Sequence, residues 1–249
     1  MKGLVLIVVC CIIFSSASAQ DGKVNWKKIK VLVYTKNGKG YVHDNISSAV
    51  KCIQKLGEQN GFIMDVSDSP IVFTEENLKQ YSILIFPSTN NDVFDTDEQR
   101  LSFRHFIEAG GGFVGLHSVV GTERNWTWFK MMLGGSFSWH PKFQKYKLQV
   151  IDPDHSSMVG LPKVWEREDE CYFQKELYPG VRPLLAHDLS TLDVGADSVK
   201  LKLNRGTFGR YYPAAWYQQF DGAQFGSQHW VTIRRIMKIR FIFSTFFKA

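Results

Sequence analysis

Four short apolar runs, separated by amphipathic stretches, constrain the fold of this chain more than any other feature. The runs are rich in Val, Ile, Leu and Phe, as expected of strands buried on both faces, and they occupy residues 29–34, 62–66, 83–86 and 112–116. Between them, residues 45–59 carry an apolar helical stripe, and Thr96 and Gln99 have the spacing of a capping box. This alternation predicts an α/β fold of three layers, with helices on both faces of a mostly parallel central sheet.

Polar and glycine residues mark the expected element boundaries. Asp44 or Asn45 is the expected cap of the first helix, Gly61 its end, and Thr74 the start of a short helical turn. After Gly121 the pattern is less regular, and we expect a Trp-rich helix over 125–132 and strands near 146–151 and 181–187.

The N-terminus has the pattern of a secretory signal peptide. Lys2 precedes an apolar run over residues 4–14, and Ala17-Ser18-Ala19 has the small-x-small form that signal peptidase cleaves. An apolar run of about 11 residues is too short for a bilayer, which needs about 20. We therefore predict a signal peptide over residues 1–19, export to the periplasm or the extracellular space, and a mature chain without an integral membrane segment.

The positive charge of the chain is concentrated at its two ends. The formal net charge is +6, and it is accounted for by Lys2 and five residues of the C-terminal tail, which are Arg234, Arg235, Lys238, Arg240 and Lys248. The body of the chain is therefore neutral. Because a nucleic-acid-binding protein carries its basic patch on the folded domain, we predict no nucleic-acid partner.

The sharpest candidate site is the strand end Gly115-Leu116-His117-Ser118. A tight strand-to-helix turn with a glycine two residues before its apex projects the apex side chain over the end of the sheet, where α/β proteins bind ligands. Here the apex is His117, which could act as a general base, bind a metal or hydrogen-bond a ligand. Ser118 lies one residue past the apex and is a weaker candidate.

Further histidines and a carboxylate are available to the same site. Gly134 and Gly135 permit close approach of backbone to a ligand, and Pro141 fixes His140 in an extended turn. His43 and Glu170 add two more polar groups. Because no H-x-x-x-H or H-x-H spacing is present, we predict no metal and no other cofactor.

Several motifs together resemble the ThuA-like, or trehalose-utilisation, family over roughly residues 29–223. The matching segments are Tyr41-Val42-His43-Asp44-Asn45-Ile46, Gly110-Gly111-Gly112-Phe113-Val114-Gly115-Leu116-His117, Phe137-x-x-His140-Pro141 with Gln144, Asp169-Glu170-x-Tyr172, and Tyr212-Pro213-Ala214-Ala215-Trp216. Val42, Asn45 and Tyr212 depart from the family pattern, which has Arg, Ser and His there. The resemblance implies a flavodoxin-like fold of the class I glutamine amidotransferase type, and the absent amidotransferase cysteine argues against glutaminase chemistry.

Two functions remain open. The first is a sugar-active hydrolase or isomerase of trehalose or related glycoside or keto-sugar utilisation. In it, His117 is the central acid/base and His43, His140 and Glu170 assist. The predicted ligand-binding residues are Ser118, Trp139, Gln144, Tyr172 and Trp216. The second is a non-catalytic module that binds a sugar or a partner, which the departures at Val42, Asn45 and Tyr212 favour.

The C-terminal tail departs from the family. Its members continue after the Trp216 block with an aromatic-rich strand and Leu-Gly-His. If the codons are read one nucleotide earlier, His229-Trp230-Val231 gives Leu-Gly whatever synonymous codons are used, and Thr232 permits His. We therefore predict a domain over residues 20–222 and an out-of-frame tail over 223–249.

Overall fold

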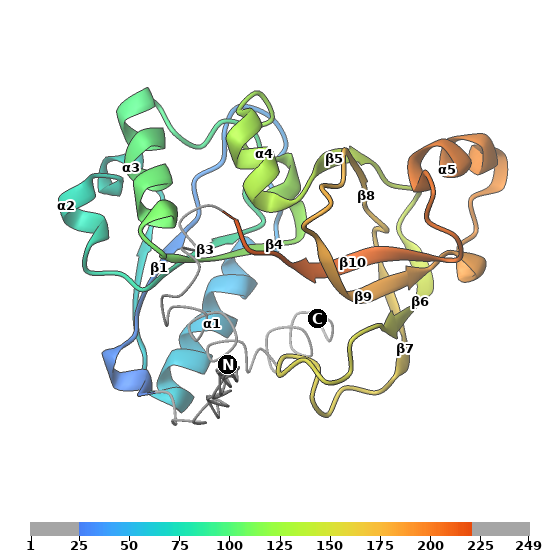
Figure 1. Cartoon of the computed structure of the whole chain (residues 1–249), viewed down its shortest axis with the longest axis horizontal. Helices are drawn as coiled ribbons and strands as arrows, with labels where there is room; N and C mark the ends of the chain where they lie inside the picture. Colours follow the sequence, from blue (N-terminus) through green and yellow to red (C-terminus); the bar gives the residue numbers. More distant parts are fainter. Residues whose placement is uncertain (1–24, 221–249) are drawn as a thin grey trace, which may run out of the picture.

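The computed structural model describes residues 25–220, and its N-terminal half is built on a parallel sheet (Figure 1). The strands are β1 (Lys30–Tyr34), β2 (Ile63–Ser67), β3 (Ile83–Pro87) and β4 (Gly112–Leu116). They pair in the order β2-β1-β3-β4, and every pair is parallel. This is the flavodoxin-like order, in which the chain reverses direction across the sheet between β1 and β3.

Helices cover both faces of the parallel sheet. On one side lies α1 (Ile46–Asn60); on the other lie α2 (Glu75–Leu78), α3 (Asp97–Glu108) and α4 (Thr127–Leu133) (Figure 1). The predicted three-layer α/β arrangement with a parallel central sheet is therefore confirmed.

The two faces of the sheet are sealed by separate apolar clusters. In β1, Leu32 and Tyr34 face α3 and α4, whereas Val31 and Val33 pack with Ile53 of α1. All five are at most 2% exposed. Alternate side chains of one strand thus enter different layers, which is why the strands read as continuous apolar runs rather than as alternating ones.

Local sequence signals set most of the helix boundaries. The capping box at the start of α3 is present, since Thr96 accepts from the backbone of Gln99 and the Gln99 side chain accepts from the backbone of Thr96. Gly61 ends α1 with a φ of 89°. The prediction for Asn45 was wrong in detail: it occupies the N-cap position of α1 in a helical backbone conformation, and its side chain makes no capping hydrogen bond.

The C-terminal half forms a second, antiparallel sheet that the sequence did not predict. Its strands are β6 (Gln144–Val150), β7 (Val164–Asp169), β9 (Arg182–Asp188) and β10 (Tyr211–Tyr217), in the order β10-β9-β6-β7. A two-stranded ribbon of β5 (Ser136–Trp139) and β8 (Phe173–Lys175) lies between the two halves, and α5 (Ser198–Arg205) lies beside the second sheet (Figure 1). Two of these strands, β6 and β9, were expected from the sequence.

Two terminal predictions lie outside the described residues. The signal peptide over 1–19 and the out-of-frame tail over 223–249 both belong to segments that the structure does not describe. Within residues 25–220, no helix combines the length and the apolar character needed to cross a membrane.

Candidate functional site

His117 stands at the end of β4 in a left-handed backbone conformation. Its φ is 51°, and it opens a five-residue 3-10 helix, His117–Gly121, where an α-helix was expected. A Cβ atom at Gly115 would lie 2.5 Å from Cγ1 of Val119, so the turn requires glycine at that position. The predicted elbow with His117 at its apex is confirmed.

Strained backbone is concentrated at this edge of the sheet. Ser88 and Asn91 follow β3 with φ values of 53° and 60°, and Glu123 follows the 3-10 helix with a φ of 47°. With His117, these are four of the five non-glycine residues with positive φ in residues 25–220. Such residues persist only where the surrounding structure holds them, and they gather at functional sites.

Five side chains from four separate segments meet beside His117, and we call them the histidine cluster: His43, His117, His140, Glu170 and Tyr172. Nε2 of His117 lies 3.3 Å from Nδ1 of His43. Oε2 of Glu170 lies 3.8 Å from Nε2 of His117, and Oε1 lies 3.7 Å from Nε2 of His140. One carboxylate therefore faces two imidazoles.

The backbone fixes the orientation of His140. Its Nδ1 lies 2.7 Å from the carbonyl oxygen of Pro141, which can only accept, so Nδ1 carries the hydrogen. Nε2 is then the nitrogen that faces Glu170, and in the neutral ring it is a proton acceptor.

Tyr172 holds the two imidazoles apart. Its ring centroid lies 4.9 Å from that of His117 and 5.2 Å from that of His140, on which it stacks at 17°. Burial raises the pKa of the Tyr172 hydroxyl above its usual range, and the charge of Glu170 and the hydrogen bond to that carboxylate add to the effect. Tyr172 is therefore a neutral hydrogen-bond donor to Glu170.

Burial keeps the two facing imidazoles neutral. It is the main cause that lowers the pKa of His117 to about 3, and the charges of His43, Arg167 and His140 act in the same direction. Burial also lowers the pKa of His43, although the nearby Glu170 and Asp44 oppose this. At neutral pH, His117 therefore presents an unprotonated nitrogen.

Comparison of the sequence with models of protein families identifies the family. The family model described as ThuA, trehalose utilisation, matches residues 30–230. The chain belongs to the ThuA family. The matched range continues past residue 222, where we expected the domain to end.

Two solved structures of ThuA-like proteins support the same fold. A ThuA-like protein from Bacteroides uniformis ATCC 8492 is 21% identical, with a TM-score of 0.65 over 90% of this chain and 94% of that chain. One from Parabacteroides merdae ATCC 43184 is 19% identical, with a TM-score of 0.57 over 78% and 76%. A glutamine amidotransferase from Thermotoga maritima matches at 8% identity over 89% of this chain and 99% of that chain, with a TM-score of 0.44. Among curated proteins, none matches the chain.

The structure brings together all four predicted catalytic residues and one predicted ligand-binding residue, Tyr172. The other predicted ligand-binding residues make their contacts elsewhere. Ser118 is 3% exposed, and its hydroxyl donates to the carbonyl of Thr89 at 3.2 Å. Gln144 binds the backbone of Asp193 through both ends of its amide, at 2.7 and 3.0 Å. Both side chains hold loops together.

The two tryptophans predicted to bind a ligand also make packing contacts. Trp139 stacks on Phe173 in the core of the second sheet, with ring centroids 5.4 Å apart. Trp216 packs against the cluster that covers the parallel sheet, and its indole nitrogen donates to the carbonyl of Leu133 at 2.8 Å. These contacts account for both residues without a ligand.

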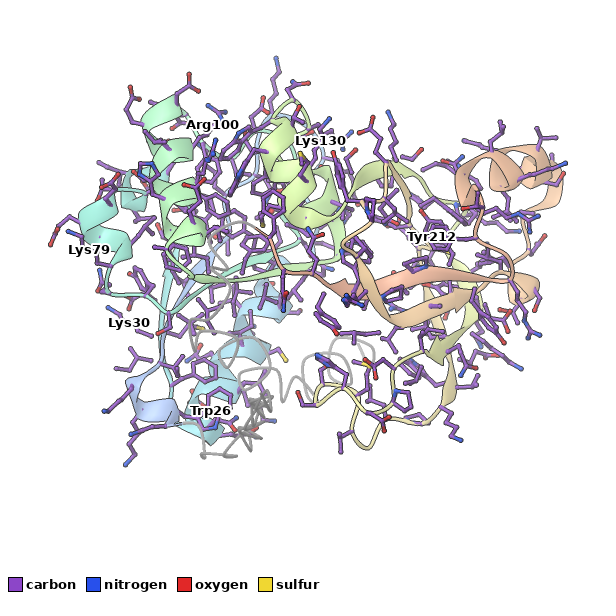
Figure 2. All side chains as sticks on the ribbon, viewed as in Figure 1. Trp26, Lys30, Lys79, Arg100, Lys130 and Tyr212 are labelled. Atoms are coloured by element: carbon purple, nitrogen blue, oxygen red, sulfur yellow. The ribbon has the colours of Figure 1, made fainter. Side chains whose placement is uncertain are left out.

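Tyr212, which stands where the ThuA pattern has histidine, has a structural role. The residue lies in the second sheet (Figure 2) and is 1% exposed. Its hydroxyl accepts from the backbone nitrogen of Gln174 at 3.0 Å and donates to the carbonyl of the same residue at 3.3 Å. Tyr212 therefore ties β10 to β8.

The sequence analysis did not assign the aromatic and cationic neighbours of the cluster to the site. Tyr41 is 69% exposed, and its ring meets His43 edge to face at 4.9 Å. Phe137 packs on Tyr172 at 4.9 Å. Arg167 is a partly buried cation paired with Asp169. Tyr41 and Phe137 were visible as members of the matching motifs, but Arg167 had no sequence signal.

No metal centre is assigned. Among residues 25–220, no group of three or more histidine, cysteine, aspartate or glutamate side chains has an arrangement that could hold a metal ion.

Proposed function

We propose that this ThuA-family chain is an exported carbohydrate-active protein whose histidine cluster performs acid–base chemistry on a sugar hydroxyl or carbonyl. The observation that carries the proposal is the convergence of three imidazoles and one carboxylate at the ligand-binding edge of the parallel sheet. The family description, trehalose utilisation, supports a carbohydrate, and the signal-peptide pattern supports export.

His117 is the proposed proton acceptor. Because burial keeps its ring neutral, its free nitrogen can accept a proton or a hydrogen bond from a substrate hydroxyl without first losing its own proton. The Glu170 carboxylate, 3.8 Å away, stabilises the imidazolium that forms. A general base with so low a pKa is weak, so this stabilisation by Glu170 is needed for turnover.

Glu170 and His140 complete a path for the proton. The separations of 3.8 and 3.7 Å on either side of the carboxylate exceed a direct hydrogen bond, and a sugar hydroxyl placed between the groups would bridge them. A proton taken by His117 can pass through the bridging hydroxyl and the Glu170 carboxylate to Nε2 of His140, which then returns it to the sugar. The arrangement suits a reaction in which a proton leaves one atom of the sugar and returns at another.

Turnover of a sugar panel tests the proposal. The panel is trehalose, other disaccharides, their keto derivatives and acidic sugars; turnover is followed by NMR, and binding is measured by calorimetry. We expect the wild-type chain to convert at least one sugar, and His117→Gln and Glu170→Gln to lose at least about a hundredfold in kcat while still binding it.

A matched control is His105→Gln, which removes an exposed histidine paired with Glu75 on the surface of α2 and α3. It should leave turnover unchanged. If the wild type binds a sugar and converts none, the chain is a binding module and the catalytic proposal is wrong. If no sugar binds, the carbohydrate proposal itself is refuted.

A further inference from the structure

Arg124 lies close to the histidine cluster and has no part in the acid–base chemistry above. It follows the 3-10 helix that His117 opens, at the same edge of the parallel sheet. Its guanidinium carbon lies 5.6 Å from the ring centroid of Phe137, which in turn packs on Tyr172 at 4.9 Å. The positive charge of Arg124 also acts on the pKa of Tyr172. One aromatic ring thus separates this cation from the cluster.

Neutral groups fix the side chain in place. Nε donates to the carbonyl of Gly121 at 2.9 Å, and Nη2 donates to Oδ1 of Asn90 at 3.1 Å. Asn90 is 8% exposed, and its own amide nitrogen donates to the carbonyl of Tyr41 at 3.3 Å. The contacts therefore run continuously from Tyr41, whose ring meets His43, through Asn90 to Arg124, whose guanidinium lies against Phe137.

No carboxylate of the described residues neutralises the anchored cation. Within residues 25–220, no carboxylate oxygen lies within 4.0 Å of the Arg124 guanidinium, whereas Arg100, Arg104, Arg167 and Arg210 each have such a partner. Arg124 remains solvent-exposed. Of its five N–H groups, two are used by the bonds to Gly121 and Asn90. Three donors and a full positive charge are left for a ligand.

We infer that Arg124 binds an oxyanion on the substrate, so that the sugar recognised by this chain is an acidic one. The inference rests on the proposed function, since it names the class of carbohydrate that the cluster receives. A guanidinium held in one orientation binds a carboxylate or a phosphate through two parallel hydrogen bonds, and it loses little entropy in doing so.

The charges of the cluster fix how such a sugar lies. Glu170 carries a negative charge between His117 and His140 and repels an anion, so the acidic group cannot occupy that position. Among the described residues around the cluster, Arg167 is paired with Asp169, whereas Arg124, beside Phe137, offers the oxyanion a cation without a carboxylate partner. The anionic group therefore anchors the sugar at Arg124, and a hydroxyl or carbonyl of the same sugar reaches the histidines.

Calorimetric binding of three related sugars tests the inference. The probes are methyl glucoside, which is neutral, methyl glucuronide, which carries a carboxylate, and glucose 6-phosphate, which carries a phosphate. We expect at least one of the two acidic probes to bind about tenfold or more tightly than the neutral one, with the preference weakened by salt. Which acidic probe is preferred identifies the oxyanion.

Two variants separate recognition from a structural role. Arg124→Gln should lose about tenfold or more in affinity for the acidic probe and less than about twofold for the neutral one. Arg124→Lys should retain part of the preference because it keeps the charge. Arg182→Gln is the matched control, since it removes the same charge from an exposed position at the start of β9, and it should change neither affinity.

The inference is overturned if the wild type binds neutral and acidic probes equally, or if Arg124→Gln weakens both by the same factor. The first result does not depend on whether any variant folds. Failure of all three probes to bind also overturns it, whereas the proposed acid–base function is tested by the His117→Gln turnover assay on neutral sugars. The two failures are therefore distinguishable.

Discussion

His187 makes this protein sensitive to mild acid. It lies in the middle of the second sheet at 5% exposure, opposite Leu148 and Tyr212, with its ring against Tyr146 at 5.3 Å. Within the described residues, its Nδ1 has no hydrogen-bond partner. Burial lowers its pKa from 6.5 to about 3, and the positive charge of Arg167 adds to the effect.

The sign and size of the effect follow from this difference. Because the unfolded chain binds the proton more tightly than the folded one, protonation favours unfolding. The stabilisation is complete above about pH 6.5 and is lost as the pH falls toward 3. Between pH 7.5 and pH 5, His187 therefore costs about 2 kcal/mol of the free energy of unfolding.

Urea unfolding of wild type and His187→Leu at both pH values measures this quantity. Leucine is of similar volume and has no polar atom, so we expect the variant to be as stable as wild type at pH 7.5. At pH 5 the variant should be about 2 kcal/mol more stable than wild type. All other titrating groups are the same in both proteins, so their contribution cancels in the comparison. Parallel pH dependence of the two proteins would refute the reasoning.

Three further contacts give predictions, each measured by urea unfolding. Glu123→Gln should cost about 3–5 kcal/mol, because the Glu123 carboxylate is 2% exposed and pairs with Arg100 at 2.8 Å; a loss below 1 kcal/mol would contradict the role of that pair. Tyr212→Phe should cost about 1–3 kcal/mol, because the buried backbone nitrogen of Gln174 loses its acceptor; an unchanged unfolding midpoint would contradict this. Trp216→Phe should cost about 1–2 kcal/mol, because the hydrogen bond to the last turn of α4 is lost, and it should leave sugar binding unchanged. Weakened sugar binding at unchanged stability would instead indicate that Trp216 contacts the sugar.

The N-terminal half was predictable because its signals are local. Strands buried on both faces must be apolar throughout, so the four runs were visible without any knowledge of their partners. The capping box at Thr96 and Gln99 and the left-handed end of α1 at Gly61 depend on residues adjacent in the chain. The βαβ rhythm then leaves few possible topologies.

The antiparallel sheet was not predictable in the same way. Its pairing joins β6 to β9 and β9 to β10 across long stretches of chain, and no short turn connects these strands. Strand β7 alternates exposed charged residues with Trp165, Arg167 and Asp169, which lowers its apolar signal. Its structure is decided by pairing with strands that are distant in the sequence, which the local residue pattern does not show.

The candidate site was predictable in its reactive groups and less so in its surroundings. His117 was identified because glycine spacing and strand position together define the elbow, and the matching motifs supplied His43, His140, Glu170 and Tyr172. Aromatic type alone could not separate a sugar platform from a packing residue, and in the structure Trp139 and Trp216 both make packing contacts.

A crystal structure with a bound sugar tests the central claim most directly. The sugar is the one that the binding assays select, diffused into crystals of the His117→Gln variant so that turnover does not remove it. The account predicts a sugar hydroxyl or carbonyl within hydrogen-bonding distance of both Glu170 and His140, beside residue 117 at the end of β4. A sugar bound elsewhere, with the cluster making no contact to it, would contradict the account.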